Sequence, residues 1–425
     1  MKIEQLHTLF LECHSVCTDT RKLKSNDMFF ALKGENFNGN SYAEHALKNG
    51  ARYSIIDEKT YKTSSQTILV ENVLETLQKL AAYHRTYLNI PIIALTGSNG
   101  KTTTKELINA TLSQKYNTTA TVGNLNNHIG VPLTLLSMNK QTEIGIIEMG
   151  ANHQKEIEFL CTIAKPDFGY ITNFGKAHLE GFGSVEGVIK GKTELYNFIK
   201  ANNKTIIVNG TDPIQMEKSK DANTYSFGNK AHFNVQIKFI EAQPNVSVEY
   251  NNIRIKSHLI GDYNFNNIAA AITFGNYFKV EDSAIKTAIE NYIPSNNRSQ
   301  VIKKGANNII LDAYNANPTS MHAALLNFEK LKEVSKTAFL GDMFELGQDA
   351  EVEHQNIVNL IATLNFQAVL IGENFNRTKI NSSKIVVFKT FDDFKNNYDI
   401  TKTTNATLLI KGSRGMAMER ILDLL

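Results

Sequence analysis

The segment that most constrains the fold runs from Ile92 to Lys105 and places a glycine-rich turn between an apolar stretch and a helical one. Residues 90–95 are apolar except for one proline and predict a buried strand, and apolar side chains recur at helical spacing after Lys101. Successive backbone N–H groups in such a turn, with the following helix N-terminus, form a cradle for phosphate. In this pattern Lys101 reaches the terminal phosphates and the Thr102 hydroxyl holds Mg²⁺. The expected nucleotide-binding residues of the loop are Gly97, Ser98, Asn99, Gly100, Lys101, Thr102 and Thr103.

The loop departs from the full phosphate-loop pattern at one position. That pattern has a glycine five residues before Gly100, where this chain has Leu95. The shorter form Gly-x-x-Gly-Lys-Thr-Thr remains. A glycine turn with a solvated lysine is the alternative, but the flanking strand and helix favour a phosphate loop.

Length and composition limit the class of protein. A chain of 425 residues suggests about three domains at roughly 150 residues each. The net charge of +3 gives no electrostatic footprint for nucleic acid. The three cysteines, Cys13, Cys17 and Cys161, do not complete a zinc site and predict reduced thiols. The chain has neither a signal-peptide pattern nor an apolar run of membrane-spanning length, so we expect a cytoplasmic protein without membrane insertion.

The order of strand-like and helical segments predicts an α/β protein of three domains. We expect a small α/β N-terminal domain over residues 1–88, a central phosphate-loop ATPase domain with a parallel sheet over 89–297, and a C-terminal Rossmann-like α/β domain over 298–425. Within the central domain, alternating residues 245–258 around Asn251-Asn252 predict an antiparallel hairpin. The third domain should be built on strands at 308–312, 337–340, 368–371, 384–388 and 407–410.

Polar side chains follow several predicted strands of the central domain. Glu148 ends the strand at 144–147, on the same sheet edge as the phosphate loop, where a carboxylate can hold Mg²⁺ or its water. A plain surface glutamate is the alternative. His178, in the loop after the next strand, is either a metal ligand or a structural histidine. Lys192 lies on the following helix, where a lysine is normally a solvated charge.

Polar sequences also occur in the outer domains. In the first, Thr18-Asp19-Thr20-Arg21 is either a turn with an exposed arginine or a clamp for an anionic ligand. In the third, polar clusters at 312–318, 341–347 and 411–415 follow strands, which indicates a ligand crevice at that edge.

Together these motifs resemble the Mur ligase family over almost the whole chain. The resemblance is carried by Thr96-Gly-Ser-Asn-Gly-Lys-Thr-Thr, Glu148-Met-Gly-Ala, Thr172-Asn173 with His178, and Lys192 with Glu194. The third-domain sequences Tyr314-Asn-Ala-Asn-Pro, Gly341-Asp-Met-Phe-Glu-Leu-Gly and Lys411-Gly-Ser-Arg most resemble the family member that adds D-alanyl-D-alanine.

The resemblance implies an ATP-dependent peptide-bond ligase of peptidoglycan precursor synthesis. Its substrates would be UDP-N-acetylmuramoyl-tripeptide and D-Ala-D-Ala, bound by a first domain for the UDP substrate and a third domain for the dipeptide and for closure. The tripeptide carboxylate would be phosphorylated by ATP, and the amine of D-Ala-D-Ala would attack the acyl phosphate. We expect a monomer that takes these small molecules as its partners.

The resemblance also assigns residues. Lys101, Glu148, His178 and Lys192 would be catalytic. Two Mg²⁺ ions are expected, with Thr102, Glu148, His178 and a carbamylated Lys192 as the metal-site residues. ATP would also meet Asn267 on the adenine side, Arg298 at the phosphates and Asp312 at the ribose. Substrate residues would be Thr20, Arg21, Asn126, Asn127, His128, Thr172, Asn173, Asn315, Asn317 and Arg414.

This chain departs from the family pattern at Leu311 and Ala313, which replace an Asp and a Ser, and at Tyr263, which replaces a His. None of the three is assigned to chemistry.

Two alternatives stay open. One is a related ligase: a Mur ligase that adds another amino acid, or a folylpolyglutamate-type ligase. Among the former, the diaminopimelate-adding ligase typically has Asp-Asn-Pro-Arg in its third domain, whereas this chain has Asn315-Ala-Asn-Pro in a different context. A folylpolyglutamate-type ligase would not be expected to have this first domain. The other is a nucleotide-switched binding protein, which would need a guanine-specifying Asn-Lys-x-Asp sequence that does not stand out here.

Overall fold

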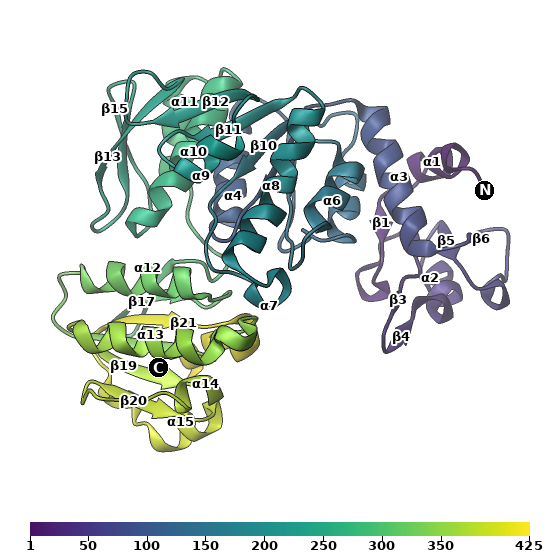
Figure 1. The fold of residues 1–425 in the computed structure, drawn as a ribbon. Helices are drawn as coiled ribbons and strands as arrows, with labels where there is room; N and C mark the ends of the chain where they lie inside the picture. The colour runs from purple at the N-terminus through teal and green to yellow at the C-terminus, as the bar shows by residue number, and fades with distance from the viewer.

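The protein, in a computed structural model that describes residues 1–425, contains three separate main sheets along the chain (Figure 1). The α/β fold class is therefore confirmed, while the predicted boundaries at 88/89 and 297/298 remain predictions. None of the helices combines the length and apolar character that a membrane span requires.

The N-terminal part forms a four-stranded parallel sheet in the order β1-β2-β5-β6. Helix α3 caps its N-terminus with the Asn72 side chain, which accepts a hydrogen bond from Glu75 N, and ends at left-handed Asn89. It packs against helices of the central part, so it joins the first two parts of the chain. The elements are α1 (Ile3–Leu11), β1 (Val16–Cys17), β2 (Met28–Phe30), β3 (Lys33–Gly34), β4 (Phe37–Asn38), α2 (Ala43–Lys48), β5 (Tyr53–Ile56), β6 (Thr67–Leu69) and α3 (Val73–Leu88).

The central part is built on a nine-stranded sheet in the order β15-β14-β13-β12-β11-β10-β7-β9-β8. Strands β8 to β13 pair in parallel, and the predicted hairpin β14–β15 is antiparallel around Asn251 and Asn252, which both have positive φ. The strands are β7 (Ile92–Thr96), β8 (Thr118–Ala120), β9 (Ile144–Glu148), β10 (Phe168–Ile171), β11 (Thr205–Asn209), β12 (Asn223–Gly228), β13 (Val235–Glu241), β14 (Ser247–Tyr250) and β15 (Ile253–Lys256).

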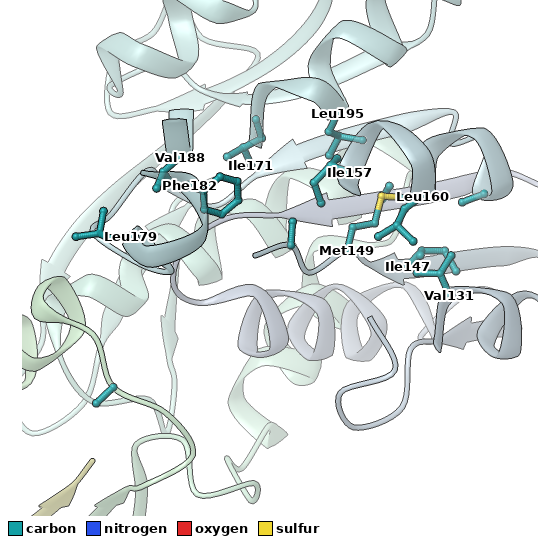
Figure 2. Close-up of a cluster of buried hydrophobic side chains, with 14 of the residues drawn as sticks. Val131, Ile147, Met149, Ile157, Leu160, Ile171, Leu179, Phe182, Val188 and Leu195 are labelled. Carbon is teal, nitrogen blue, oxygen red and sulfur yellow. The ribbon is translucent and has the colours of Figure 1, made fainter. Parts of the chain in front are cut away.

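Helices cover both faces of the parallel strands. Along β7, Ile92 and Ala94 join one core cluster while Ile93 and Leu95 join the other, as the strand period of two requires. Figure 2 shows the first cluster, where side chains of α5, α6, α7 and α8 pack over β9 and β10. The helices are α4 (Lys101–Leu112), α5 (Gly130–Leu136), α6 (Glu156–Ala164), α7 (Leu179–Phe182), α8 (Val185–Ala201), α9 (Pro213–Lys218), α10 (Phe265–Tyr277) and α11 (Asp282–Asn291).

The C-terminal part forms a six-stranded sheet in the order β16-β17-β21-β18-β19-β20. The five predicted strands are present and mutually parallel; β16, at the edge, is antiparallel and was not predicted, because its short run of Lys, Gln and apolar residues is only half-buried. The elements are β16 (Gln300–Lys304), β17 (Asn307–Asp312), α12 (Pro318–Glu329), β18 (Lys336–Gly341), α13 (Ala350–Thr363), β19 (Gln367–Ile371), α14 (Glu373–Asn376), β20 (Ile385–Phe388), α15 (Phe391–Asn397) and β21 (Thr407–Lys411).

Candidate active site

A cavity of about 1000 Å³ lies where the phosphate loop and the strand ends of the central part meet the C-terminal part. Helix α3 of the N-terminal part contributes Gln78 to its wall. The cavity is as large as the biggest ordinary ligand pockets, which suits more than one substrate.

The phosphate loop is shaped by two glycines and braced from β10. Gly97 has φ +146° and Gly100 has φ +80°, and a Cβ on Gly97 would lie 1.9 Å from Thr172 Oγ1. The Thr172 hydroxyl donates to Asn99 O at 2.6 Å. Asn173 Nδ2 donates to Asn99 O at 2.9 Å, and Asn173 Oδ1 accepts the backbone N–H of Asn99 at 3.1 Å. Thr172 and Asn173 therefore hold the loop in shape, a role that their position in the sequence did not reveal.

Two of the four predicted metal-site residues, Thr102 and Glu148, are in direct contact. Thr102 Oγ1 donates to Glu148 Oε2 at 2.9 Å, and Asn126 Nδ2 donates to Glu148 Oε1 at 2.8 Å. A hydroxyl beside a carboxylate is the hard-oxygen donor set that suits Mg²⁺. No group of three or more His, Cys, Asp or Glu side chains is close enough to hold a metal, so an ion here would take its remaining ligands from phosphate oxygens and water.

Two lysines of the central part, Lys101 and Lys192, have lowered side-chain pKa values. Lys101 Nζ donates to Gly97 O at 2.7 Å, and burial lowers the pKa of its ammonium group. Lys192 is fully buried on α8, whereas Lys190, one half-turn away, is exposed. Burial, followed by the charge of Lys101, lowers the pKa of Lys192 well below its ordinary value. Lys192 Nζ lies 3.3 Å from Ala151 O and does not itself line the cavity.

Glu194, which carried the resemblance together with Lys192, has a structural role. Its carboxylate accepts the backbone N–H groups of Lys155 at 2.6 Å and of Glu158 at 3.0 Å. It therefore caps the first turn of α6.

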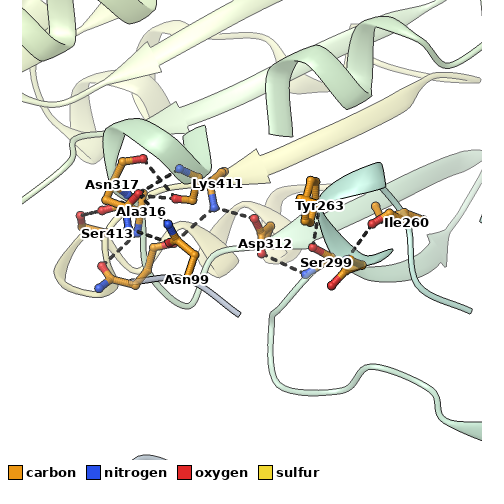
Figure 3. Close-up of polar contacts among 12 residues, drawn as sticks. Asn99, Ile260, Tyr263, Ser299, Asp312, Ala316, Asn317, Lys411 and Ser413 are labelled. Carbon is orange, nitrogen blue, oxygen red and sulfur yellow. Dashed lines mark hydrogen bonds and ion pairs between the residues drawn. The ribbon is translucent and has the colours of Figure 1, made fainter. Parts of the chain in front are cut away.

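The C-terminal part forms one wall of the cavity and shares a polar network there with residues of the central part (Figure 3). Asp312 Oδ1 accepts the backbone N–H of Ser299 at 3.0 Å, and its Oδ2 accepts Lys411 Nζ at 2.5 Å. The Tyr263 hydroxyl lies 3.1 Å from Ser299 Oγ. Asn317 Nδ2 donates to Asn99 Oδ1 at 2.7 Å, which links the third part directly to the phosphate loop.

Other predicted residues fall into two groups. Ser98, Asn99, Gly100, Thr103, Asn127, His128, His178, Asn267, Arg298 and Asn315 all line the cavity. Thr20, Arg21 and Arg414 do not line it, and neither do Gly97 and Thr172. Arg21 is exposed and makes a two-bond contact with Asp19, at 2.9 and 2.8 Å, and Arg414 pairs with Glu419 at 3.2 Å.

Some lining residues were missed by sequence reasoning. Lys411 and Tyr263 were noticed but given no role, although Lys411 follows a strand in a polar cluster, which was a usable signal. Asp212, Gln154 and Lys155 also line the cavity, and they stand in segments without a motif that could have indicated it.

Comparison with known proteins defines the family. Profiles described as Mur ligase family, catalytic domain, as Mur ligase middle domain and as Mur ligase, glutamate ligase domain match residues 12–85, 95–275 and 297–414. The chain belongs to the Mur ligase family.

Its relatives are similar along their full length. The UDP-N-acetylmuramoyl-tripeptide–D-alanyl-D-alanine ligase of Bacillus subtilis is 33% identical over 427 residues, covering 96% of this chain and 92% of the relative. A crystal structure of MurF from Acinetobacter baumannii has a TM-score of 0.87 at 30% identity and covers 100% of this chain and 98% of that one. The MurF ligase of Thermotoga maritima in complex with ADP has a TM-score of 0.84 at 28% identity, covering 98% and 97%.

Proposed function

We propose that this chain uses ATP to join D-alanyl-D-alanine to UDP-N-acetylmuramoyl-tripeptide, in peptidoglycan precursor synthesis. One observation carries the proposal: a single large cavity is lined by a phosphate loop, a carboxylate beside a hydroxyl, and a polar edge of the third part, in a chain 33% identical over its length to a ligase of that name.

The chemistry requires activation of the tripeptide carboxylate. A carboxylate is a poor electrophile because its leaving group would be an oxide, and phosphorylation by ATP supplies phosphate as a better one. The amine of D-Ala-D-Ala then attacks the acyl carbon, and the tetrahedral intermediate expels phosphate.

The residues of the central part suit the first step. Lys101 and the loop N–H groups balance the charge of the β- and γ-phosphates as it shifts toward the leaving ADP. Thr102 and Glu148 would hold one Mg²⁺ and His178 a second. Mg²⁺ held there would polarise the phosphoryl oxygens and offset the negative charge of the tripeptide carboxylate.

Lys192 suits carbamylation. Only a neutral amine adds to CO₂, and the lowered pKa of this buried side chain favours the neutral form. A carbamate would turn this amine into a hard oxygen donor that suits Mg²⁺.

The remaining assignments combine residues of the cavity wall with Thr20, Arg21, Thr172 and Arg414, which lie outside it. Asn267, Arg298 and Asp312 would bind ATP, with the Arg298 guanidinium stacked 3.7 Å from the Tyr314 ring centre. Asp19 leaves the terminal Nη1 of Arg21 free, so Arg21, with Thr20, can present donors to the UDP diphosphate. Asn126, Asn127, His128, Thr172 and Asn173 would serve the muramyl-peptide side, and Asn315, Asn317 and Arg414 the dipeptide side and closure.

We also propose that the enzyme acts as a monomer in the cytoplasm. ATP, the proposed phosphate donor, is available in that compartment.

The test is phosphate release with ATP, Mg²⁺, UDP-MurNAc-tripeptide and D-Ala-D-Ala, with each omitted in turn. Release that needs both organic substrates, with a pentapeptide product by mass, supports the proposal. Release with the tripeptide and a different amine would be consistent with the family assignment but would contradict D-Ala-D-Ala as the amine substrate. Release from ATP alone, indifferent to both, would contradict a ligase.

A further inference from the structure

The loop of residues 174–180 connects the phosphate loop to the C-terminal part. On one side, Ser98 Oγ donates to Gly175 O at 2.8 Å. On the other, Lys176 N donates to Thr319 Oγ1 at 3.0 Å, and Lys176 Nζ pairs with Glu353 at 2.6 Å. Any change in the distance between the two parts must therefore act on this loop.

The central contact of the loop joins His178 to Glu345. His178 Nδ1 lies 2.6 Å from Glu345 Oε2, an ion-pair distance, although the ring N–H is not aligned well enough for a hydrogen bond. The backbone of Glu345 is held nearby, because its carbonyl accepts Glu180 N at 3.2 Å. His178 has φ +53° and Glu345 has φ +62°, so both residues adopt the left-handed conformation that side-chain-bearing residues avoid. Such outliers persist where surrounding contacts impose them, commonly at functional sites.

The arrangement leaves one ring nitrogen of His178 free. Nδ1 is buried against the carboxylate, whereas Nε2 has no hydrogen-bond partner and is not among the buried unpartnered atoms. His178 also lines the cavity. With its proton on Nδ1, facing Glu345, the neutral imidazole presents the Nε2 lone pair, which is the form that binds a metal ion.

We propose that Glu345 is a positioning residue for the reaction: it sets the ring orientation and tautomer of His178, so that Nε2 becomes a metal ligand only when the C-terminal part is docked. A carboxylate on the second nitrogen of a metal-binding histidine commonly has this effect. The two parts then assemble the second metal position jointly, so that phosphoryl transfer requires the C-terminal part to be docked. The inference rests on the proposed function, because that function places a metal at His178.

The experiment measures Mn²⁺ binding by electron paramagnetic resonance, in the presence of a non-hydrolysable ATP analogue and without the dipeptide. The variants are Glu345→Ala, Glu345→Gln and His178→Ala, the last setting the full loss. Glu353→Gln is the matched control, because it breaks another ion pair of the same interface, to Lys176, without touching His178. Small-angle scattering of each complex reports whether the parts are docked.

We expect Glu345→Ala to weaken the second Mn²⁺ by ~10- to 100-fold. Glu345→Gln should retain most of the affinity, because its amide oxygen keeps a polar acceptor beside His178 Nδ1. Glu353→Gln should leave Mn²⁺ binding within about 2-fold of wild type. Wild-type affinity in Glu345→Ala, or equal losses in Glu345→Ala and Glu353→Gln, would overturn the inference, the latter assigning the contact to docking alone. Failure of the proposed function is separate, because it appears as wild-type protein that forms no pentapeptide.

Discussion

The two ends of the cavity are built in different ways. At the phosphate end, Thr102, Glu148 and Lys192 are buried within one part of the chain, and their partners lie in that same part. Where the central part faces the C-terminal part, the contacts cross between parts, as in Asn99 with Asn317 and His178 with Glu345. The Thr102–Glu148 site is therefore organised within one part of the chain, whereas the side that faces the C-terminal part depends on contacts between parts.

We expect the largest effect on activity from a change at the phosphate loop. Lys101→Met removes the cation that faces the phosphates, so we expect phosphate release to fall by ~10²–10³-fold. The Tm should not fall, because burial already disfavours the charge of Lys101 in the folded protein. Steady-state phosphate release and thermal unfolding check both parts. Activity within 10-fold of wild type would show that the loop amides suffice.

The second prediction concerns Lys192, the buried lysine of helix α8. Lys192→Met should lower turnover by ~10- to 100-fold, because it removes the residue that would carry the carbamate ligand. Wild-type activity should also fall in CO₂-free buffer and return with bicarbonate. Lys190→Met, an exposed lysine on the same helix, is the control and should remain active. Bicarbonate-independent activity of wild type would contradict carbamylation.

We expect an effect of intermediate size from a substitution in the N-terminal part. Arg21→Ala should raise the KM for the UDP substrate by ~10-fold with kcat unchanged, because a charge-assisted hydrogen bond to the diphosphate is lost. Its neighbour Lys22 is exposed and is the matched control as Lys22→Ala. Equal, small changes of the KM in both variants would indicate that the Asp19–Arg21 pair only stabilises a local turn.

A smaller effect should come from the contact between parts. Asn317→Ser removes the hydrogen bond to Asn99 but preserves an N-cap for α12, since serine caps well. We expect the KM for D-Ala-D-Ala to rise by about 2- to 10-fold, the value of one hydrogen bond. The Tm should be unchanged. A lower kcat with unchanged KM would place Asn317 in the chemical step instead.

The smallest effect concerns stability where the N-terminal helices meet the central part. His7 Nε2 lies 3.0 Å from His84 Nδ1, and His84 Nε2 lies 2.9 Å from Met138 O. Burial, followed by the charge of His84, lowers the pKa of His7 to about 4. The unfolded chain takes up this proton below about pH 6.5 and the folded chain does not, so stability is complete above that pH and is lost as pH falls toward 4.

We expect the Tm to fall by at least ~3 °C between pH 7 and pH 4.5 through this pair. His7→Gln should reduce the decrease, whereas His45→Gln, at an exposed histidine, should not. Equal pH profiles for both variants would assign the decrease to other groups.

Much of the fold could be predicted because local patterns determine it. Strand-like runs separated by helical stretches identified the strands of the third part, and the glycine turn located the phosphate loop between β7 and α4. Edge strand β16 escaped because its half-buried side chains give no strong pattern. The positions of Lys192 and Glu194 were found, but the capping role of Glu194 was not, since its partners lie 36 and 39 residues away.

The sequence by itself determined the phosphate loop, the Thr102–Glu148 pairing and the family, because these depend on short motifs at ends of strands and helices. Only the tertiary structure decided which polar groups meet across the parts. Thr172 became a brace for the loop, Lys411 a partner of Asp312, and Glu345 a partner of His178. Such contacts join residues separated by tens to hundreds of positions, and their energies depend on burial and geometry that no local pattern encodes.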